Sequence, residues 1–265
     1  MRLAEIRIYP VKSLHGDAYA SAVVEPRGLE GDRRWLVVDG ANRFLTQREL
    51  SHMATIAARN EPGGLALSAP DRKPLFVPIP PPDAASHRVT IWRDTVEAVT
   101  AGREAESWIT GALGVPCSLV YQANPASRPV NPAFAAPGDV VSFADGYPLL
   151  VTTTASLSDL NARLHTPVPM PRFRPNLVID GALPWAEDQW HRIRIGAALF
   201  RVPKPCDRCT IPSIDQETGL RPDPEEPLRT LKTFRRDASG RVLFGTNLVP
   251  EALGIVRVGD EVEAE

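Results

Sequence analysis

The residues best suited to chemistry in this sequence are two cysteines separated by two residues. They lie in Pro205-Cys206-Asp207-Arg208-Cys209-Thr210, directly after the strand-like residues 198–202. A structural zinc site needs four ligands and an iron–sulfur cluster normally takes four cysteines, but the only other cysteine is Cys117. A thioredoxin-like dithiol would open a helix, whereas prolines stand close on both sides of this pair. None of these three sites fits.

Two interpretations of the cysteine pair remain open from the spacing alone. In the first, one cysteine acts as a thiolate ligand or a nucleophile in an electropositive site. Arg208 beside it and Lys204 nearby would lower the pKa of that thiol. In the second, both cysteines are buried and inert, as free cysteines commonly are.

Four further segments carry basic side chains next to apolar stretches. A single cluster of this kind is usually a solvated surface. Four of them in loops beside strands could converge on a cofactor that carries a phosphate, through bidentate arginine contacts. The segments are Tyr9-Pro10-Val11-Lys12-Ser13, Gly31-Asp32-Arg33-Arg34-Trp35, Thr46-Gln47-Arg48-Glu49 and Arg172-Phe173-Arg174-Pro175-Asn176.

Composition limits the class of partner. The 265 residues include 30 Lys+Arg and 32 Asp+Glu, a formal net charge of -2, so no global basic field attracts nucleic acid or an anionic membrane. No apolar run approaches the ~18 residues that span a bilayer. Three cysteines are too few for a disulfide scaffold, which favours a reducing cytoplasm. We therefore expect a cytoplasmic protein with neither nucleic acid nor membrane as a partner.

The elements that must position these residues are mostly short strands. The 27 prolines disfavour long helices, and apolar stretches such as 35–38, 89–92 and 255–258 are typical of strands. Helical spacing predicts helices over 103–113, ended by Gly114, and over 155–164, capped by Thr154 or Ser156. A third helix is predicted over 225–236. The fold class is therefore mainly β with a few helices (α+β), in a barrel architecture.

The best candidate for a domain boundary lies between residues 115 and 140. The stretch 121–138 is rich in Pro, Ala and Asn, which predicts a connection or a lid. We divide the chain into an N-terminal domain over 1–120 and a second domain over 121–265. Motifs for a P-loop, a dinucleotide-binding glycine loop, a zinc protease or a nucleophile elbow are absent from the sequence.

The order of short motifs resembles that of the MOSC superfamily, and within it the mitochondrial amidoxime-reducing components and their bacterial relatives. The resemblance covers nearly the whole chain. Each motif is weak by itself, but the ordered set is specific. The motifs are Y-P-V-K-S at 9–13, G-D-R-R-W at 31–35, T-Q-R-E at 46–49, A-S-L-S-D-L-N at 155–161, R-F-R-P-N at 172–176, W-A-E-D-Q-W at 185–190, I-G at 195–196, P-C-D-R-C at 205–209, D-Q-E-T-G at 215–219, P-L-R-T-L at 227–231, F-G at 244–245 and V-G-D at 258–260.

This resemblance implies an N-terminal MOSC β-barrel domain packed on a MOSC β-barrel domain, with a molybdenum cofactor (Mo-molybdopterin) between them and no pyridoxal phosphate. The second cysteine of the pair, Cys209, would bind the molybdenum, since a thiolate is a soft ligand for a redox metal. Cys206 would be structural or supporting. The residues implied in binding the cofactor are Lys12, Ser13, Arg33, Arg48, Arg174, Asn176, Arg208 and Cys209.

The implied reaction is reduction of small N-hydroxylated compounds, namely amidoximes, hydroxylamines and N-hydroxylated bases. Cys209 and Asp207 are the candidate catalytic residues, the second as a proton donor beside the metal ligand. We expect a stand-alone bacterial form whose electrons come from a separate donor protein, a reductase with a ferredoxin-like or flavin carrier. The alternative is a sulfur-transfer or cofactor-carrier protein in which Cys209 carries a persulfide or hands the cofactor onward.

Overall fold

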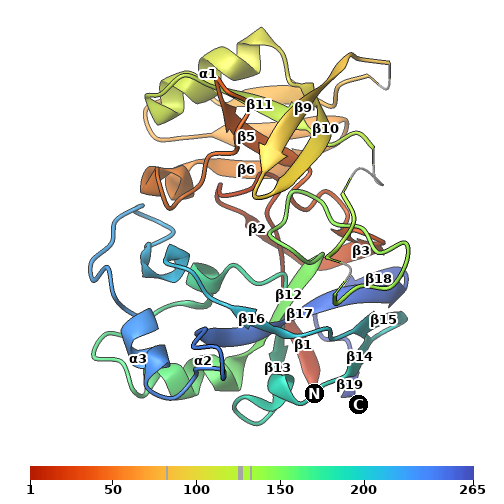
Figure 1. Ribbon diagram of the computed structural model, residues 1–265, viewed down its shortest axis with the longest axis vertical. Coiled ribbons are helices and arrows are strands. Elements are labelled where there is room, and N and C mark those ends of the chain that lie inside the picture. The colour runs from red at the N-terminus through yellow and green to blue at the C-terminus, as the bar shows by residue number, and fades with distance from the viewer. Residues whose placement is uncertain (82, 125–127, 132) are drawn as a thin grey trace.

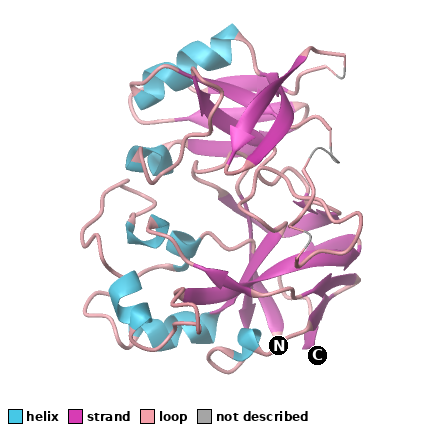
Figure 2. Cartoon of the chain, in the orientation of Figure 1, coloured by secondary structure: helices cyan, strands magenta, loops and turns pink. Residues whose placement is uncertain are grey.

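The computed structural model describes residues 1–81, 83–124, 128–131 and 133–265, and it consists mainly of strands (Figure 2). Two packed units lie one above the other in Figure 1. The predicted fold class, mainly β with a few helices, is confirmed.

The upper unit in Figure 1 contains two antiparallel sheets and one long helix. One sheet has the order β5-β11-β10-β9 and the other the order β6-β7-β8. Helix α1 (Arg103–Leu113) ends where predicted, because Gly114 takes a left-handed conformation (φ 70°). The strands are β5 (Trp35–Asp39), β6 (Ala57–Glu61), β7 (Gly64–Ser68), β8 (Leu75–Pro78), β9 (Ser86–Ile91), β10 (Asp94–Thr100) and β11 (Cys117–Tyr121).

The lower unit is built around a nine-stranded sheet with the order β19-β14-β15-β17-β12-β13-β1-β2, to which β16 adds by pairing with β17. Its neighbours are antiparallel except for the parallel pair β12 and β13, which helix α2 connects. The strands from the second half of the chain are β12 (Leu149–Thr153), β13 (Leu177–Asp180), β14 (Arg192–Ile195), β15 (Ala198–Arg201), β16 (Pro205–Asp207), β17 (Leu243–Ala252), β18 (Gly254–Arg257) and β19 (Val262–Ala264).

The first four strands of the chain belong to the lower unit. Strand β1 (Arg2–Ile8) pairs with β13 and with β2 (Asp17–Tyr19), while β3 (Ser21–Glu25) pairs with β18 and with β4 (Gly28–Leu29). The division proposed at residues 120 and 121 therefore divides the sequence, whereas in space strands β1 to β4 pack with the second half and the turn between β1 and β2 packs with the upper unit. The reason is hydrophobic: Leu3, Ile6 and Val24 are buried in the core of the lower unit.

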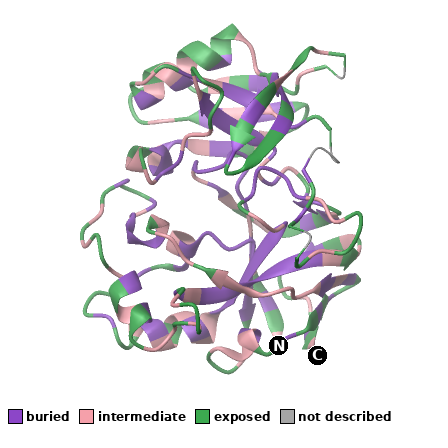
Figure 3. Ribbon diagram, viewed as in Figure 1, coloured by how far each residue is buried: buried purple, intermediate pink, exposed green. Residues whose placement is uncertain are grey.

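Each unit has its own hydrophobic core, visible as the buried strands in Figure 3. In the upper unit, Trp35 and Val37 pack against Ile109 of α1. In the lower unit, the cluster that includes Ile6 also contains Phe200 and Val256. The clusters of the two units are separate, and polar side chains such as Lys12, Arg33 and Arg174 lie between them.

The two other helices differ from their predicted limits. Helix α2 (Thr154–Asn161) is capped by Thr153, whose side chain accepts a hydrogen bond from the Ser156 amide, rather than by Thr154 or Ser156. Helix α3 (Leu228–Lys232) is much shorter than 225–236, because Pro227 precedes it. Among the described residues, no helix has the length and apolar character needed to cross a membrane.

The segment between β11 and β12 contains neither a helix nor a named strand among its described residues, so its reading as a connection is confirmed there. Residues 125–127 and 132, which belong to the predicted stretch 121–138, lie outside the described residues. Arg128 anchors the connection. Its guanidinium donates to the carbonyls of Ser142, Ala144 and Asp145 and pairs with Asp94 of β10.

Candidate functional site

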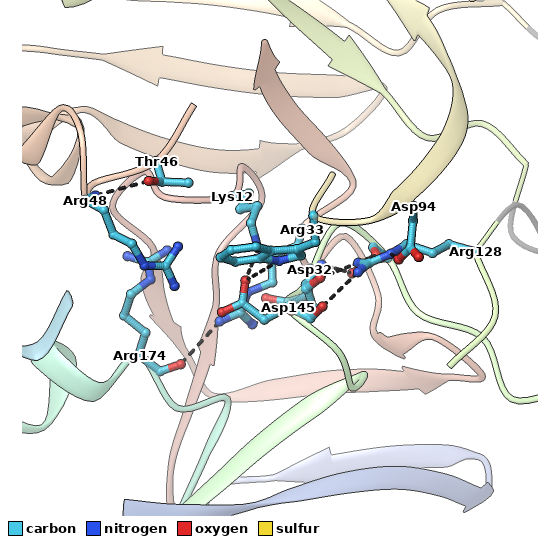
Figure 4. Close-up of polar contacts among 12 residues, drawn as sticks. Lys12, Asp32, Arg33, Thr46, Arg48, Asp94, Arg128, Asp145 and Arg174 are labelled. Carbon is cyan, nitrogen blue, oxygen red and sulfur yellow. Dashed lines mark hydrogen bonds and ion pairs between the residues drawn. The ribbon is translucent and has the colours of Figure 1, made fainter. Parts of the chain in front are cut away.

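A cavity at the seam between the units brings together all eight residues predicted to bind a cofactor. Residues 12, 13, 33 and 48 line it from the first part of the chain, and residues 174, 176, 208 and 209 line it from the second. Cys206 and Asp145 line it as well. Figure 4 shows Arg48 and Arg174 reaching toward the same space from the two units.

The cavity is strongly basic although the chain as a whole is nearly neutral. Five of its described lining residues carry a positive charge, and Asp145 is the one acid among them. The five are Lys12, Arg33, Arg48, Arg174 and Arg208. Such a local excess of positive charge attracts an anion.

Lys12 and Ser13 follow β1 in a turn that the upper unit holds in place. The Lys12 amide donates to the Trp35 carbonyl (3.0 Å), and the Gln47 side chain donates to the Ser13 carbonyl (2.7 Å). The Lys12 ammonium forms an ion pair with Asp145 across the cavity (Figure 4). Burial lowers the pKa of Lys12 to about 8, against the opposing effect of Asp145. Desolvation acts to raise the pKa of Asp145, but Lys12 outweighs it and holds this pKa well below its usual range.

Arg33 crosses the seam by hydrogen bonds on both of its terminal nitrogens. Nη1 donates to Asp32 (2.6 Å) and to the Asn176 side chain (2.9 Å), while Nη2 donates to the Arg174 carbonyl (3.2 Å). Burial would lower the pKa of Arg33, but the adjacent Asp32 carboxylate outweighs it and raises that pKa. Arg33 is therefore charged at every pH at which the protein folds.

Arg174 has a weaker set of partners. Nη1 donates to the Gln216 side chain (3.2 Å), and the guanidinium lies 4.2 Å from the centroid of the Tyr9 ring. Nη2 is buried and has no hydrogen-bond partner among the described residues. Burial lowers the pKa of Arg174 to about 10. A buried donor with no partner beside a cavity is a sign that a ligand belongs there.

Backbone strain is concentrated at this cavity. Seven described residues other than glycine have a positive φ, and three of them line the cavity: Ser13 (68°), Arg33 (48°) and Arg174 (56°). Trp92 (56°), next to the cavity, is a fourth. Side chains other than glycine adopt this region at a cost, and such residues cluster at functional sites.

Asn176 and Arg48 differ in how firmly they are held. Asn176 is buried and joins three segments: its Oδ1 accepts from Arg33 and from the Leu150 amide, and its Nδ2 donates to the Arg7 carbonyl. The guanidinium of Arg48 has no hydrogen bond or ion pair with any described residue. Its contact is with the ring of Trp92, at 4.7 Å from the centroid.

The two cysteines occupy different environments. Cys206 lies in β16 and accepts a hydrogen bond from Arg208 Nη1 (3.1 Å). The other terminal nitrogen of Arg208, Nη2, donates to the Phe173 carbonyl. Burial raises the pKa of Cys206, more than Arg208 lowers it. Cys209 lines the cavity, and its Sγ makes no hydrogen bond to the described residues. Arg208 therefore contacts Cys206 rather than Cys209, and Lys204 pairs with Asp207.

Asp207 is not among the residues that line the cavity. Its carboxylate is half exposed and pairs with Lys204 (2.9 Å). Although desolvation acts to raise it, the pKa of Asp207 is lowered by the hydrogen bond and charge of Lys204. A carboxyl group that stays ionised and is not part of the cavity lining is poorly suited to donate a proton there.

Sequence reasoning missed two residues that shape the site, Asp145 and Arg128. Both lie in the connection between the units, where no periodicity or motif marks them. The cluster Ser142-Phe143-Ala144-Asp145-Gly146 carried no signal, because only the folded chain places it against Lys12. The third cysteine, Cys117, is buried in the upper core, where the Thr110 hydroxyl donates to its carbonyl.

The described residues contain no group of three or more His, Cys, Asp or Glu side chains that could hold a bare metal ion. Cys209 alone cannot supply a complete coordination sphere.

Comparison with known proteins agrees with this geometry. The MOSC N-terminal beta barrel domain model matches residues 1–116 and the MOSC domain model matches residues 138–263. Human mitochondrial amidoxime-reducing component 1 is 35% identical over 277 residues, which cover 98% of this chain and 82% of the human protein. Human mitochondrial amidoxime reducing component 2 is 32% identical, with the same coverage. Molybdenum cofactor sulfurase of Oryza sativa subsp. japonica is 31% identical over 92% of this chain but only 32% of its own length. The chain therefore belongs to the MOSC-domain family that includes the mitochondrial amidoxime-reducing components.

Proposed function

We propose that this protein binds a molybdenum cofactor in the basic cavity and reduces small N-hydroxylated compounds. The observation that carries the proposal is the convergence of Lys12, Arg33, Arg48 and Arg174 on one cavity with the Cys209 thiol. The relatives named for amidoxime reduction support the reaction class.

The residues present fit such a group. The anionic end of the cofactor needs cations that are free to bind it. Arg48 and Arg174 lie near the Asp145 charge but form no direct ion pair with a described carboxylate. The unpartnered Nη2 of Arg174 needs an acceptor. The metal needs a soft ligand, and Cys209 offers a sulfur that is not committed to another contact.

The chain's own residues have distinct tasks in this proposal. Lys12, Arg33, Arg48 and Arg174 hold the phosphate of the cofactor, and Cys209 holds the metal as a thiolate. Asn176 keeps Arg33 in place, and Arg208 keeps Cys206 in place. When bound, the cofactor supplies two-electron chemistry that cleaves the N–O bond. Two electrons and two protons are consumed, and the products are the reduced nitrogen compound and water.

The electrons come from a separate donor protein, and we place the protein in the cytoplasm. The sequence contains neither a nucleotide-binding glycine loop nor the cysteine set of a ferredoxin. The three cysteines are free, which suits a reducing compartment.

The second candidate function is sulfur transfer or cofactor carriage through Cys209. The molybdenum cofactor sulfurase among the relatives, together with the uncommitted Sγ of Cys209, supports it. This candidate predicts that the cofactor dissociates during purification and that no N-hydroxylated compound is turned over.

The test is turnover of an amidoxime by the molybdenum-loaded protein under anaerobic conditions. Viologen reduced by dithionite should support turnover, whereas NADH alone should not. Loaded protein that leaves the amidoxime unchanged with reduced viologen would contradict the reductase and favour the carrier. Reduction by NADH alone would contradict the need for a separate donor.

A further inference from the structure

The turn between β9 and β10 places a tryptophan where glycine or asparagine is favoured. Ile91 pairs with Asp94, so Trp92 and Arg93 are the two residues of the hairpin loop. Trp92 has φ 56°, in the left-handed region. Two-residue hairpin loops use residues such as glycine at positions of positive φ, and a bulky side chain there is strained.

The indole ring of Trp92 reaches from this turn to the basic cavity. The guanidinium of Arg48 lies 4.7 Å from the ring centroid, and the Phe44 ring lies 4.8 Å away on a tilted plane. Nε1 donates a hydrogen bond to Asp145 Oδ1 (3.3 Å). Trp92 as a whole is 44% exposed, so filling the hydrophobic core does not account for a tryptophan at this position.

Arg48 depends on this ring more than the other cavity residues depend on any one neighbour. Lys12, Arg33, Arg174 and Arg208 each have a hydrogen bond or an ion pair to hold the charged group. The guanidinium of Arg48 has neither among the described residues. The polar contacts of Arg48 there are made by its backbone, whose amide donates to Thr46 and whose carbonyl accepts from Arg221. A long side chain that is not held in place loses more conformational entropy when it binds an anion.

We propose that Trp92 is a positioning residue that holds Arg48 over the cavity, ready to bind the anionic end of the cofactor. This inference rests on the proposed function, and it gives the strained turn between β9 and β10 a role in binding the cofactor. The cation–π contact with Arg48 keeps the guanidinium in place, and the bond to Asp145 ties the hairpin of the upper unit to the loop that carries the acid.

The test is a double-mutant cycle on retention of the cofactor, with Trp92→Gly, Arg48→Ala and both changes together. Retention is measured well below the unfolding temperature, from the fluorescence of the oxidised pterin left on the protein after gel filtration. Trp92→Gly and Arg48→Ala should each weaken retention by about tenfold, the effect of one lost contact to a charged group. The double variant should equal Arg48→Ala within about twofold, because Trp92 acts through Arg48.

Two controls separate positioning from a merely structural role. Trp92→Phe keeps an aromatic face for Arg48 and should restore most of the retention lost in Trp92→Gly. The midpoint of thermal unfolding should move by only a few degrees in Trp92→Gly, since glycine relieves the strain and offsets the lost ring contacts. Asp71→Gly relieves strain at another positive φ, 59°, away from the cavity lining, and should leave retention unchanged.

Each outcome has a clear meaning. Additive losses in the double variant, or full retention in Trp92→Gly, would overturn the positioning role while leaving the proposed function intact. Failure of the unmodified protein to retain cofactor would overturn the proposed function, and this inference with it.

Discussion

Arg174 and Arg34 are almost identical in burial yet line different cavities, and the difference separates a ligand site from a structural one. Both residues are 8% exposed. Burial lowers the pKa of each to about 10. Arg174 lines the basic cavity with the cysteines, whereas Arg34 lines a second cavity of about 560 Å³.

Protein groups hold the terminal Nη2 of Arg34, although its Nε, like the Nη2 of Arg174, is buried with no hydrogen-bond partner among the described residues. Arg34 Nη2 donates to the Gln122 carbonyl (2.6 Å) and to the Tyr121 hydroxyl (3.1 Å), and the guanidinium lies 5.0 Å from the centroid of the Tyr121 ring. Three glutamates line this second cavity against two arginines: Glu25, Glu30, Glu61, Arg34 and Arg257. Its charge is therefore close to balanced, and it carries neither a cysteine nor an excess of cations.

The comparison teaches that a buried arginine does not by itself mark a ligand site. In the basic cavity the cations outnumber the acids, the backbone is strained and two cysteines line the space. In the second cavity the arginine serves the packing of β11 against the start of β5. Our predictions test this distinction.

The largest effect is expected at the thiol. Replacement of Cys209 by Ser should abolish molybdenum binding and lower turnover by more than about a hundredfold, because a hydroxyl is a far poorer ligand for this metal than a thiolate. Cys206→Ser should lose less molybdenum and less turnover than Cys209→Ser, and Cys117→Ala should keep both at the level of the unmodified protein. Elemental analysis and circular dichroism of the three variants provide the check, and full molybdenum content in Cys209→Ser would refute the assignment.

The next largest effect is expected for Arg174, with the equally buried Arg34 as its control. Arg174→Met should weaken retention of the cofactor by about tenfold or more, the equivalent of one contact to a charged group. Arg34→Met removes a guanidinium of equal burial and should change retention by less than about twofold. Pterin fluorescence measures both. Equal losses of cofactor retention in the two variants would contradict our distinction between a ligand site and a structural cavity.

Lys12 should make anion binding depend on pH. Its pKa is lowered to about 8, so Lys12 is positively charged below that pH and loses the charge above it. Affinity of the cofactor-free protein for inorganic phosphate should therefore fall as the pH rises from 7 to 9. Lys12→Arg stays charged over this range and should show a flat profile in calorimetric titration. A fall of the same size in Lys12→Arg would mean that another group is responsible.

Asp207 should show the smallest effect. Its carboxylate pairs with Lys204 outside the cavity lining, and exposed ion pairs contribute little. Asp207→Asn should lower turnover by less than about threefold. A larger loss with unchanged cofactor content would restore Asp207 as the proton donor.

Local patterns in the sequence predicted the mainly β class and helix α1 with its glycine end. The resemblance to the MOSC superfamily, carried by short motifs of adjacent residues, named the eight residues that the fold brings to one cavity. The assignment of strands β1–β4 to the lower unit was not predictable in this way, because alternation shows that Leu3 and Ile6 face a core but not which core.

The same limit applies inside the cavity. Asp145 and Arg128 lie more than a hundred residues from Lys12, and only the fold places them beside it. The strain at Ser13, Arg33 and Arg174 is likewise a property of the backbone that no residue type announces, since none is glycine or asparagine.

The account depends most directly on whether the basic cavity holds a molybdenum cofactor through Cys209. The decisive measurement is the molybdenum content, by mass spectrometry, of the unmodified protein and of Cys209→Ser, both made in a host that synthesises the cofactor. We predict about one molybdenum per chain in the unmodified protein and almost none in a folded Cys209→Ser variant. A folded, unmodified protein that carries no molybdenum, or a variant that keeps it, would contradict the account.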